Sequence, residues 1–77
     1  MKAARLENSE RLQTLLLALQ MHPAGLTTME LIQRTGSVAP HSDVSELRAN
    51  GVPVDARQER CTAKGRRVWR YRLGRVA

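Results

Sequence analysis

The sequence predicts a small α+β domain in which three helices precede a two-stranded β-hairpin. Three observations lead to this fold class. Leucines recur at helical spacing in the first third of the chain, two short helical patterns flank a turn in the middle, and apolar residues alternate with polar ones in the last third. The 77 residues, 1–77, are expected to form a single domain with a compact core and short loops.

The first helix is predicted over residues 5–21, because four leucines there make one apolar stripe. Leu17 lies off this stripe, so the hairpin, the N-terminal residues or a second subunit is expected to cover it. Pro23 cannot continue the helix and ends it. The stripe consists of Leu12, Leu15, Leu16 and Leu19.

The second helix is predicted over residues 27–35. Thr27 is followed three residues later by Glu30, which is the spacing of a capping box. Leu26 and Leu31 flank this pair at the spacing of a hydrophobic staple. The start of the second helix is therefore well defined by local chemistry.

The third helix is predicted over residues 38–50, since Pro40 is tolerated only in a first turn. Val44 and Leu47 make its inward row. A second row at helical spacing holds no apolar residue and is expected to face outward: His41, Ser45 and Arg48.

The hairpin is predicted over residues 52–73, with its loop at roughly 60–66. Two-residue alternation puts one set of side chains on the core side of the strands. Asp55, on the other side, is expected to lie opposite Arg70 or Arg72. The core-side set consists of Val52, Val54, Ala56, Trp69, Tyr71 and Leu73.

Positive charge is concentrated at one end of the chain. The net charge is +6, but residues 57–75 alone carry eight basic residues and one acid, and the remainder is slightly acidic. Seven of those eight are arginines, whose planar fork suits phosphate better than lysine does. This clustering favours a polyanionic partner, and a solvated basic face is the alternative.

Several function classes are not expected. The single cysteine cannot form an internal disulfide and, with two distant histidines, makes no metal site. We expect no cofactor, no enzymatic activity and no small-molecule substrate, since no catalytic grouping and no glycine-rich phosphate loop are present. The longest apolar run, 15–19, is too short to span a bilayer, and the first ten residues contain no apolar signal. We therefore expect a cytoplasmic protein without a membrane partner.

The second and third predicted helices form a recognisable unit with the turn between them. A short turn, T-G-S, separates two short helices with apolar inner faces, which is the anatomy of a helix-turn-helix unit. The stretches GLTTMELIQRTGSVAPHSDVSELRANGVPV and GRRVWRYRL resemble the winged helix-turn-helix DNA-binding family, especially the small single-domain members of bacteriophages and prophages. The resemblance covers roughly residues 6–73. The segment VSELRANGVPV carries it best, because it joins helix, glycine cap and first strand.

This resemblance implies that the third helix lies in the major groove and that the hairpin is a wing on the phosphate backbone. The implied DNA contacts are Ser37, His41, Ser42, Ser45 and Arg48 from the helix, and Lys64, Arg66, Arg67 and Arg70 from the wing. Two acids, Asp43 and Glu46, are unusual on a recognition helix. The wing is therefore expected to supply most of the affinity, and Asp43 either faces the groove or stabilises the start of the helix.

The expected function is double-stranded DNA binding by a small phage or bacterial transcription regulator, or by a recombination accessory factor. A homodimer or a cooperative array is expected, since one subunit offers little contact area. Two alternatives stay open. A protein–protein adaptor fits the acids of the third helix, and RNA or single-stranded DNA binding fits aromatics among arginines.

Overall fold

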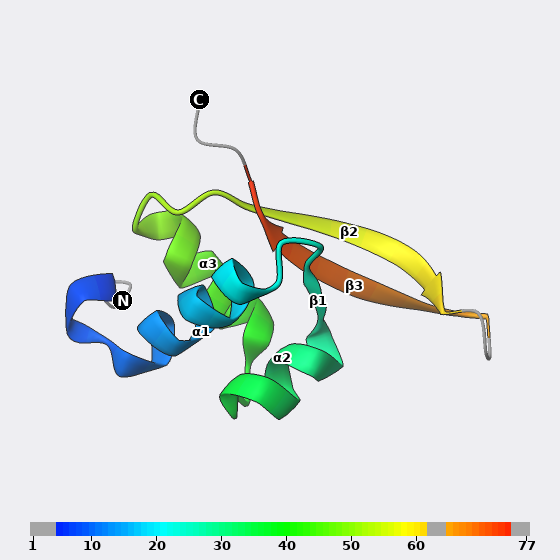
Figure 1. Ribbon diagram of the computed structural model, residues 1–77, viewed down its shortest axis with the longest axis horizontal. Coiled ribbons are helices and arrows are strands. Elements are labelled where there is room, and N and C mark those ends of the chain that lie inside the picture. Colours follow the sequence, from blue (N-terminus) through cyan, green and yellow to red (C-terminus); the bar gives the residue numbers. More distant parts are fainter. Residues whose placement is uncertain (1–4, 62–64, 75–77) are drawn as a thin grey trace.

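The computed structural model describes residues 5–61 and 65–74. It is a mixed α+β structure with three α-helices and a three-stranded antiparallel sheet of order β1-β3-β2 (Figure 1). In chain order the elements are η1 (Leu6–Asn8), α1 (Glu10–Met21), β1 (Leu26–Thr27), α2 (Thr28–Thr35), α3 (Pro40–Ala49), β2 (Val54–Cys61) and β3 (Arg66–Leu73).

The first predicted helix is divided in two. A 3₁₀ turn, η1, comes first, and α1 begins only at Glu10 because Ser9 has extended backbone angles and caps it. The Ser9 hydroxyl accepts a hydrogen bond from the backbone N–H of Leu12 at 3.2 Å. Such a cap stabilises a helix by about 1 kcal/mol. Three leucines of the predicted stripe are fully buried and Leu16 is half-buried.

The predicted capping box of α2 is confirmed. The backbone N–H of Glu30 donates to Thr27 Oγ1 at 3.2 Å, and the Thr27 N–H donates to Glu30 Oε1 at 2.9 Å. Leu26 and Leu31 are both buried beside it. The helix ends where Gly36 adopts a left-handed conformation with φ of 72°.

The third helix begins later than predicted, at Pro40, which occupies its first turn. Residues 38 and 39 precede the helix, and its N-cap residue, Ala39, makes no capping hydrogen bond with its side chain. The inward row is confirmed, since Val44 and Leu47 are 1% and 0% exposed. The helix ends at Ala49, one residue before the predicted end.

The sheet contains a third strand that the sequence analysis missed. The two residues of β1 pair with β3, placing Leu26 opposite Tyr71 and Thr27 opposite Arg70. The backbone passes close to β3 at the preceding residue, Gly25, which has φ of 94°. A Cβ there would lie 2.7 Å from the Tyr71 carbonyl oxygen. Only glycine meets both conditions without strain.

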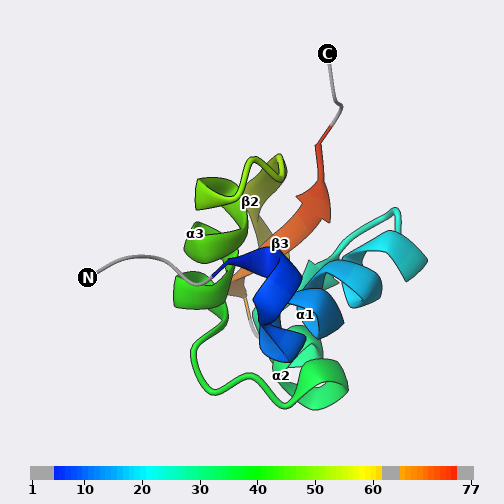
Figure 2. The same cartoon turned by 90° about the vertical axis from the view of Figure 1, so that its left-hand side faces the viewer.

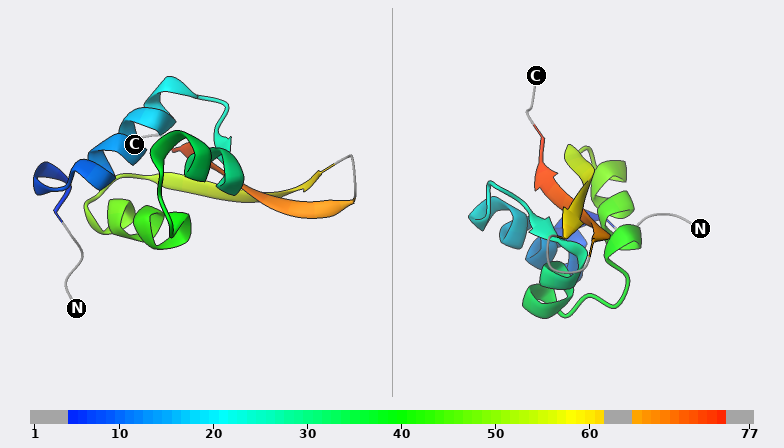
Figure 3. Two further views of the ribbon diagram at one scale, coloured as in Figure 1. Left: turned by 90° about the horizontal axis from the view of Figure 1, so that it is seen from below. Right: turned by 90° about the vertical axis from the view of Figure 1, so that its right-hand side faces the viewer.

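The core is formed by the three helices packed around the base of the hairpin (Figures 2 and 3). Beyond that base, β2 and β3 extend well past the helices as a two-stranded arm (Figure 1). Leu17 is 55% exposed, so the described residues do not cover it as predicted. The buried apolar residues are Leu12, Leu15, Leu19, Leu26, Leu31, Val44, Leu47, Val54 and Tyr71.

None of the helices in residues 5–61 and 65–74 is both long enough and apolar enough to cross a bilayer.

Candidate nucleic-acid interface

The β2–β3 hairpin has two faces of different chemistry. Residues directly opposite each other in an antiparallel pair share a face, because side chains alternate along each strand. One face, here the inner face, contains Val54, Ala56, Gln58 and Arg60 of β2 and Arg67, Trp69, Tyr71 and Leu73 of β3. The outer face contains Asp55, Arg57 and Glu59 of β2 and Arg66, Val68, Arg70 and Arg72 of β3.

Both acids of the hairpin strands lie on the outer face. Glu59 Oε1 accepts a hydrogen bond from Arg70 Nε at 2.9 Å and lies 2.8 Å from Arg70 Nη2 in an ion pair. Asp55 lies directly opposite Arg72, which is one of the two predicted partners, and its Oδ2 is 3.9 Å from Arg72 Nε. The hydrogen bond from Arg70 lowers the pKa of Glu59. Arg70 and Arg72 are therefore paired within the outer face, whereas Arg57 and Arg66 on the same face have no ion pair among the described residues.

The inner face carries uncompensated charge. Arg60 and Arg67 are exposed, lie directly opposite each other, and form no ion pair or hydrogen bond within the described parts of the chain. Together with Gln58 and the edge of Glu59 they line an open hollow of about 320 Å³. The Glu59 carboxylate is hydrogen-bonded to Arg70. The guanidinium groups of Arg60 and Arg67 can therefore both bind an anion.

The prediction that Arg70 contacts phosphate is not supported by its position. Arg70 lies on the outer face, and besides Glu59 its Nη1 donates to the Gly25 carbonyl oxygen at 3.0 Å and lies 3.9 Å from Glu30 Oε1. It thus connects three segments that are distant in sequence. The physical reason is the strand pleat, which turns Arg70 away from α3 and toward the β1–α2 corner.

The outward row of α3 is exposed as predicted, and so is Ser42. Arg48 is held in place rather than free to move. Its Nε and Nη2 donate to the Val54 carbonyl oxygen at 3.0 and 2.7 Å. No carboxylate of the described residues pairs with Arg48, so its positive charge is oriented but not neutralised.

His41 also connects α3 to the hairpin. Its Nδ1 is hydrogen-bonded to the hydroxyl group of Tyr71, and the two rings meet edge to face with centroids 5.5 Å apart. Burial raises the pKa of the Tyr71 phenol, which therefore stays neutral at physiological pH. The outward row of α3 and the hairpin are thus joined at two points, Arg48 and His41.

The two acids of α3 face away from this row. Asp43 is 4% exposed and accepts hydrogen bonds from Ser37 Oγ, at 2.6 Å, and from Arg11 of α1. Glu46 accepts a hydrogen bond from Arg11 Nη2 at 2.6 Å. This bond is the main cause of the raised pKa of Arg11. The acids therefore join α3 to α1 and do not repel a ligand on the exposed row.

Ser37 was predicted to contact DNA, and the structure places it elsewhere. Its side chain is 7% exposed, and its hydroxyl is committed to Asp43 while also accepting from the Ala39 N–H at 3.3 Å. It organises the turn between α2 and α3. The sequence could not show this, because burial of Ser37 depends on the Arg11–Asp43 contact from another helix.

An open cleft of about 250 Å³ lies between α3 and the inner face. Trp69 lines it and is 39% exposed, although the sequence analysis placed this side chain in the core. The helices cover the inner face of β3 fully only at Tyr71, and Trp69, the next residue on this face toward the tip of the hairpin, is left partly exposed. The residues around the cleft are His41, Val44, Ser45, Arg48, Ala56, Trp69 and Tyr71.

Two candidate residues were missed, and a simple signal could have found them. Arg60 has the same strand parity as Val54 and Ala56, and Trp69 has the same parity as Arg67, so all five residues lie on the inner face. Arg66, predicted with Arg67, lies on the outer face instead. Lys64, also predicted at the hairpin tip, lies outside the described residues.

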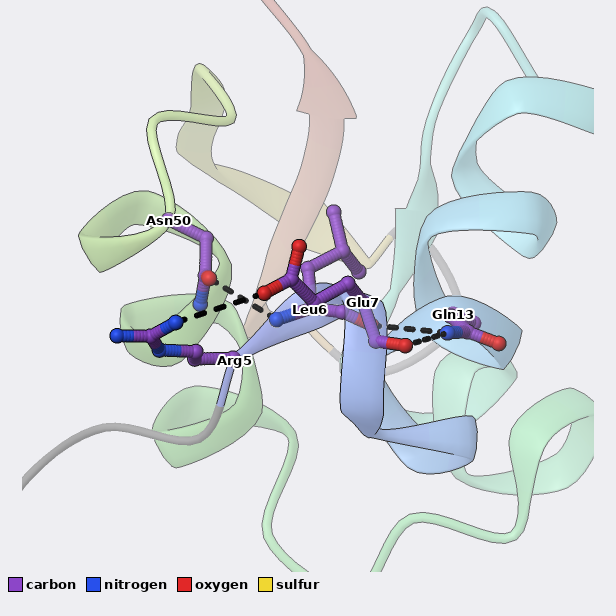
Figure 4. A pocket seen from close by; sticks show the side chains of 5 residues that line it. All are labelled: Arg5, Leu6, Glu7, Gln13 and Asn50. Atoms are coloured by element: carbon purple, nitrogen blue, oxygen red, sulfur yellow. Dashed lines mark hydrogen bonds and ion pairs between the residues drawn. The ribbon is translucent and has the colours of Figure 1, made fainter.

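A second cleft, of about 510 Å³, lies where η1 meets α1 and the end of α3 (Figure 4). Its polar groups are used internally. The Leu6 N–H donates to Asn50 Oδ1 at 2.9 Å, and Gln13 Nε2 donates to the Leu6 and Glu7 carbonyl oxygens. Arg5 lies 3.6 Å from Glu7. These contacts dock η1 between α1 and α3 and give the cleft a structural role.

No protein-family model, curated protein or solved structure matches this chain.

Proposed function

We propose that this protein is a non-enzymatic double-stranded DNA-binding protein with a winged helix-turn-helix arrangement. In this arrangement α3 lies in the major groove and the inner face of the hairpin contacts the phosphate backbone. One observation carries the proposal. The inner face, which lies beside the exposed row of α3, carries two arginines, Arg60 and Arg67, and no acid among its described residues.

The exposed row of α3 supports the same function. Ser42 and Ser45 offer short hydroxyl groups that suit phosphate or base edges, and Arg48 offers a charge that is already oriented. His41 is held beside them by Tyr71. Because these groups are pre-positioned, binding costs less side-chain ordering than it would for free surface residues.

A role in transcription regulation or as a recombination accessory factor fits a small protein that binds DNA without catalysis. A single subunit of this size presents little contact area, so specific binding needs a dimer or a cooperative array on the DNA. The exposed Leu17 on α1 is the first position to examine for contact with a second subunit.

The protein-adaptor alternative depended on the acids of the third helix. Asp43 is buried and Glu46 is paired with Arg11, so neither is presented to a partner on the exposed row. No other observation favours an adaptor over DNA binding.

The experiment is a fluorescence anisotropy titration of a labelled duplex at several salt concentrations. Three arginines, Arg48, Arg60 and Arg67, predict a slope of log affinity against log salt of about −3 per subunit. Arg67→Ala is expected to weaken binding and reduce the slope by about 1. The matched control is Arg66→Ala, which removes the neighbouring charge from the outer face and is expected to change the slope much less. Binding that is insensitive to salt contradicts the proposal.

A further inference from the structure

Trp69 is the only tryptophan of the chain, and it is not used in the core. Its side chain is 39% exposed, whereas Tyr71, two residues nearer the helices on the same face, is 2% exposed. Large aromatic side chains stabilise small domains mainly when they are buried. An indole that is left partly in water on an arginine-bearing face is therefore available for a ligand.

The cleft beside Trp69 has the chemistry of a site for one flat ring. Val44, Ala56 and Tyr71 give it apolar walls, and Ser45 and Arg48 give it polar groups. Arg48 keeps N–H groups beyond the two that it donates to the Val54 carbonyl oxygen. The volume of about 250 Å³ is below the ~300–1,000 Å³ of ordinary small-molecule sites. A single ring that belongs to a longer chain fits this space better than a free metabolite.

Positive charge lies on both sides of this cleft. Arg48 is on the α3 side, and Arg67 and Arg60 follow Trp69 toward the tip of the hairpin. A ring with an anionic group on each side is what a nucleotide within a strand presents. Base–aromatic stacking combined with flanking cations is the usual way that proteins hold unpaired nucleotides.

We infer that Trp69 and the cleft beside it bind one unpaired base, so that DNA with an unpaired base next to a duplex is the preferred ligand. This inference rests on the proposed function and specifies its ligand. The duplex part is held by the exposed row of α3, and the unpaired base stacks on the indole. A base within an intact duplex is stacked on its neighbours and cannot present its flat face to Trp69.

The test compares two labelled DNAs, an intact duplex and the same duplex with a one-base bulge. The wild-type protein is expected to bind the bulged duplex about tenfold more tightly. Its tryptophan emission is expected to be quenched on binding, and that signal comes from Trp69 alone because no other tryptophan exists. Equal affinity for the two DNAs overturns the inference, whatever the emission does.

Two variants at one position make the result specific. Trp69→Leu is expected to bind both DNAs as weakly as wild type binds the intact duplex, because it cannot stack. Trp69→Phe keeps a flat ring and is expected to keep most of the preference. A preference that persists in Trp69→Leu overturns the inference. The comparison of wild-type affinities for the two DNAs needs no variant, so the test does not depend on how Trp69→Leu folds.

The same titrations distinguish a failure of the proposed duplex binding from a failure of the base site. If neither DNA is bound in a salt-dependent manner, duplex binding is wrong and the inference falls with it. If a single strand alone binds as tightly as the bulged duplex, with the same quenching, the base site stands and duplex binding is wrong. If both DNAs bind equally and with salt dependence, duplex binding stands and the base site is wrong.

Discussion

Both faces of the hairpin carry arginines, but the arginines of the two faces differ in what they contact. On the outer face, Arg70 and Arg72 are paired with Glu59 and Asp55, and Arg70 also holds the β1–α2 corner. On the inner face, arginines opposite each other near the tip have no partner among the described residues. Strand parity therefore decides which arginines can reach an acid of the hairpin, although Arg57 and Arg66 on the outer face also have no ion pair among the described residues.

The largest expected effect is on stability, and it comes from a substitution at the base of the inner face. Tyr71→Ala removes a side chain that is 2% exposed and belongs to the core, so we expect a loss of about 3–5 kcal/mol in unfolding free energy. In a domain of this size such a loss leaves little or no folded protein. Urea unfolding followed by circular dichroism measures it. Tyr71→Phe is the control, since it keeps the ring and loses only the contacts of the hydroxyl group, among them the bond to His41, at about 1 kcal/mol.

The tip of the inner face gives the largest expected effect on binding. Replacing Arg60 and Arg67 together by Ala is expected to reduce duplex affinity by tenfold or more and the salt slope by about 2. Anisotropy titrations at several salt concentrations measure both. The outer-face double variant, Arg57→Ala with Arg72→Ala, removes the same net charge. An equal effect of the two double variants would show that the distinction between the faces is wrong.

Arg70 is expected to affect stability and not binding. Arg70→Ala removes the hydrogen bonds to Glu59 and to the Gly25 carbonyl oxygen, and we expect a loss of about 1 kcal/mol, since the site is partly exposed. Urea unfolding measures this loss. The salt slope of duplex binding is expected to stay unchanged. A reduced slope in a fully folded variant would return Arg70 to the binding surface.

The smallest effect is a dependence of stability on pH. The pKa of Glu30 is lowered chiefly by the hydrogen bond from the Thr27 backbone, and the pKa of Glu59 by the hydrogen bond from Arg70. Because the folded state prefers the ionised carboxylates, their stabilisation is present above the ordinary value of 4.5 and is lost as pH falls through the lowered values. Unfolding free energy measured from neutral pH to about pH 3 should therefore decrease. Glu59→Gln should decrease less steeply.

Local patterns predicted much of this fold. The leucine stripe of α1, the capping box at Thr27 and the exposed row of α3 each depend on residues within a few positions of one another. The alternation of the hairpin was also correct at Val54 and Tyr71. Such features are set by helix or strand periodicity and need no knowledge of the rest of the chain.

The features that were missed depend on distant contacts. The strand β1 has two residues, and it pairs with a strand that lies more than forty residues later. Burial of Asp43 requires Arg11, which is 32 residues away on α1. The exposure of Trp69 follows from where the helical cover of β3 ends. Periodicity gives the face of a side chain but not the extent of the cover above it.

The two bonds that join α3 to the hairpin, from Arg48 to the Val54 carbonyl oxygen and between His41 and Tyr71, bear on how sequence is read. They hold α3 and the hairpin in one relative position. In the proposed complex the distance between groove and backbone contacts is thus set by the protein, and the duplex has to adjust to it. Base steps that bend or narrow easily then raise affinity at positions that no side chain touches.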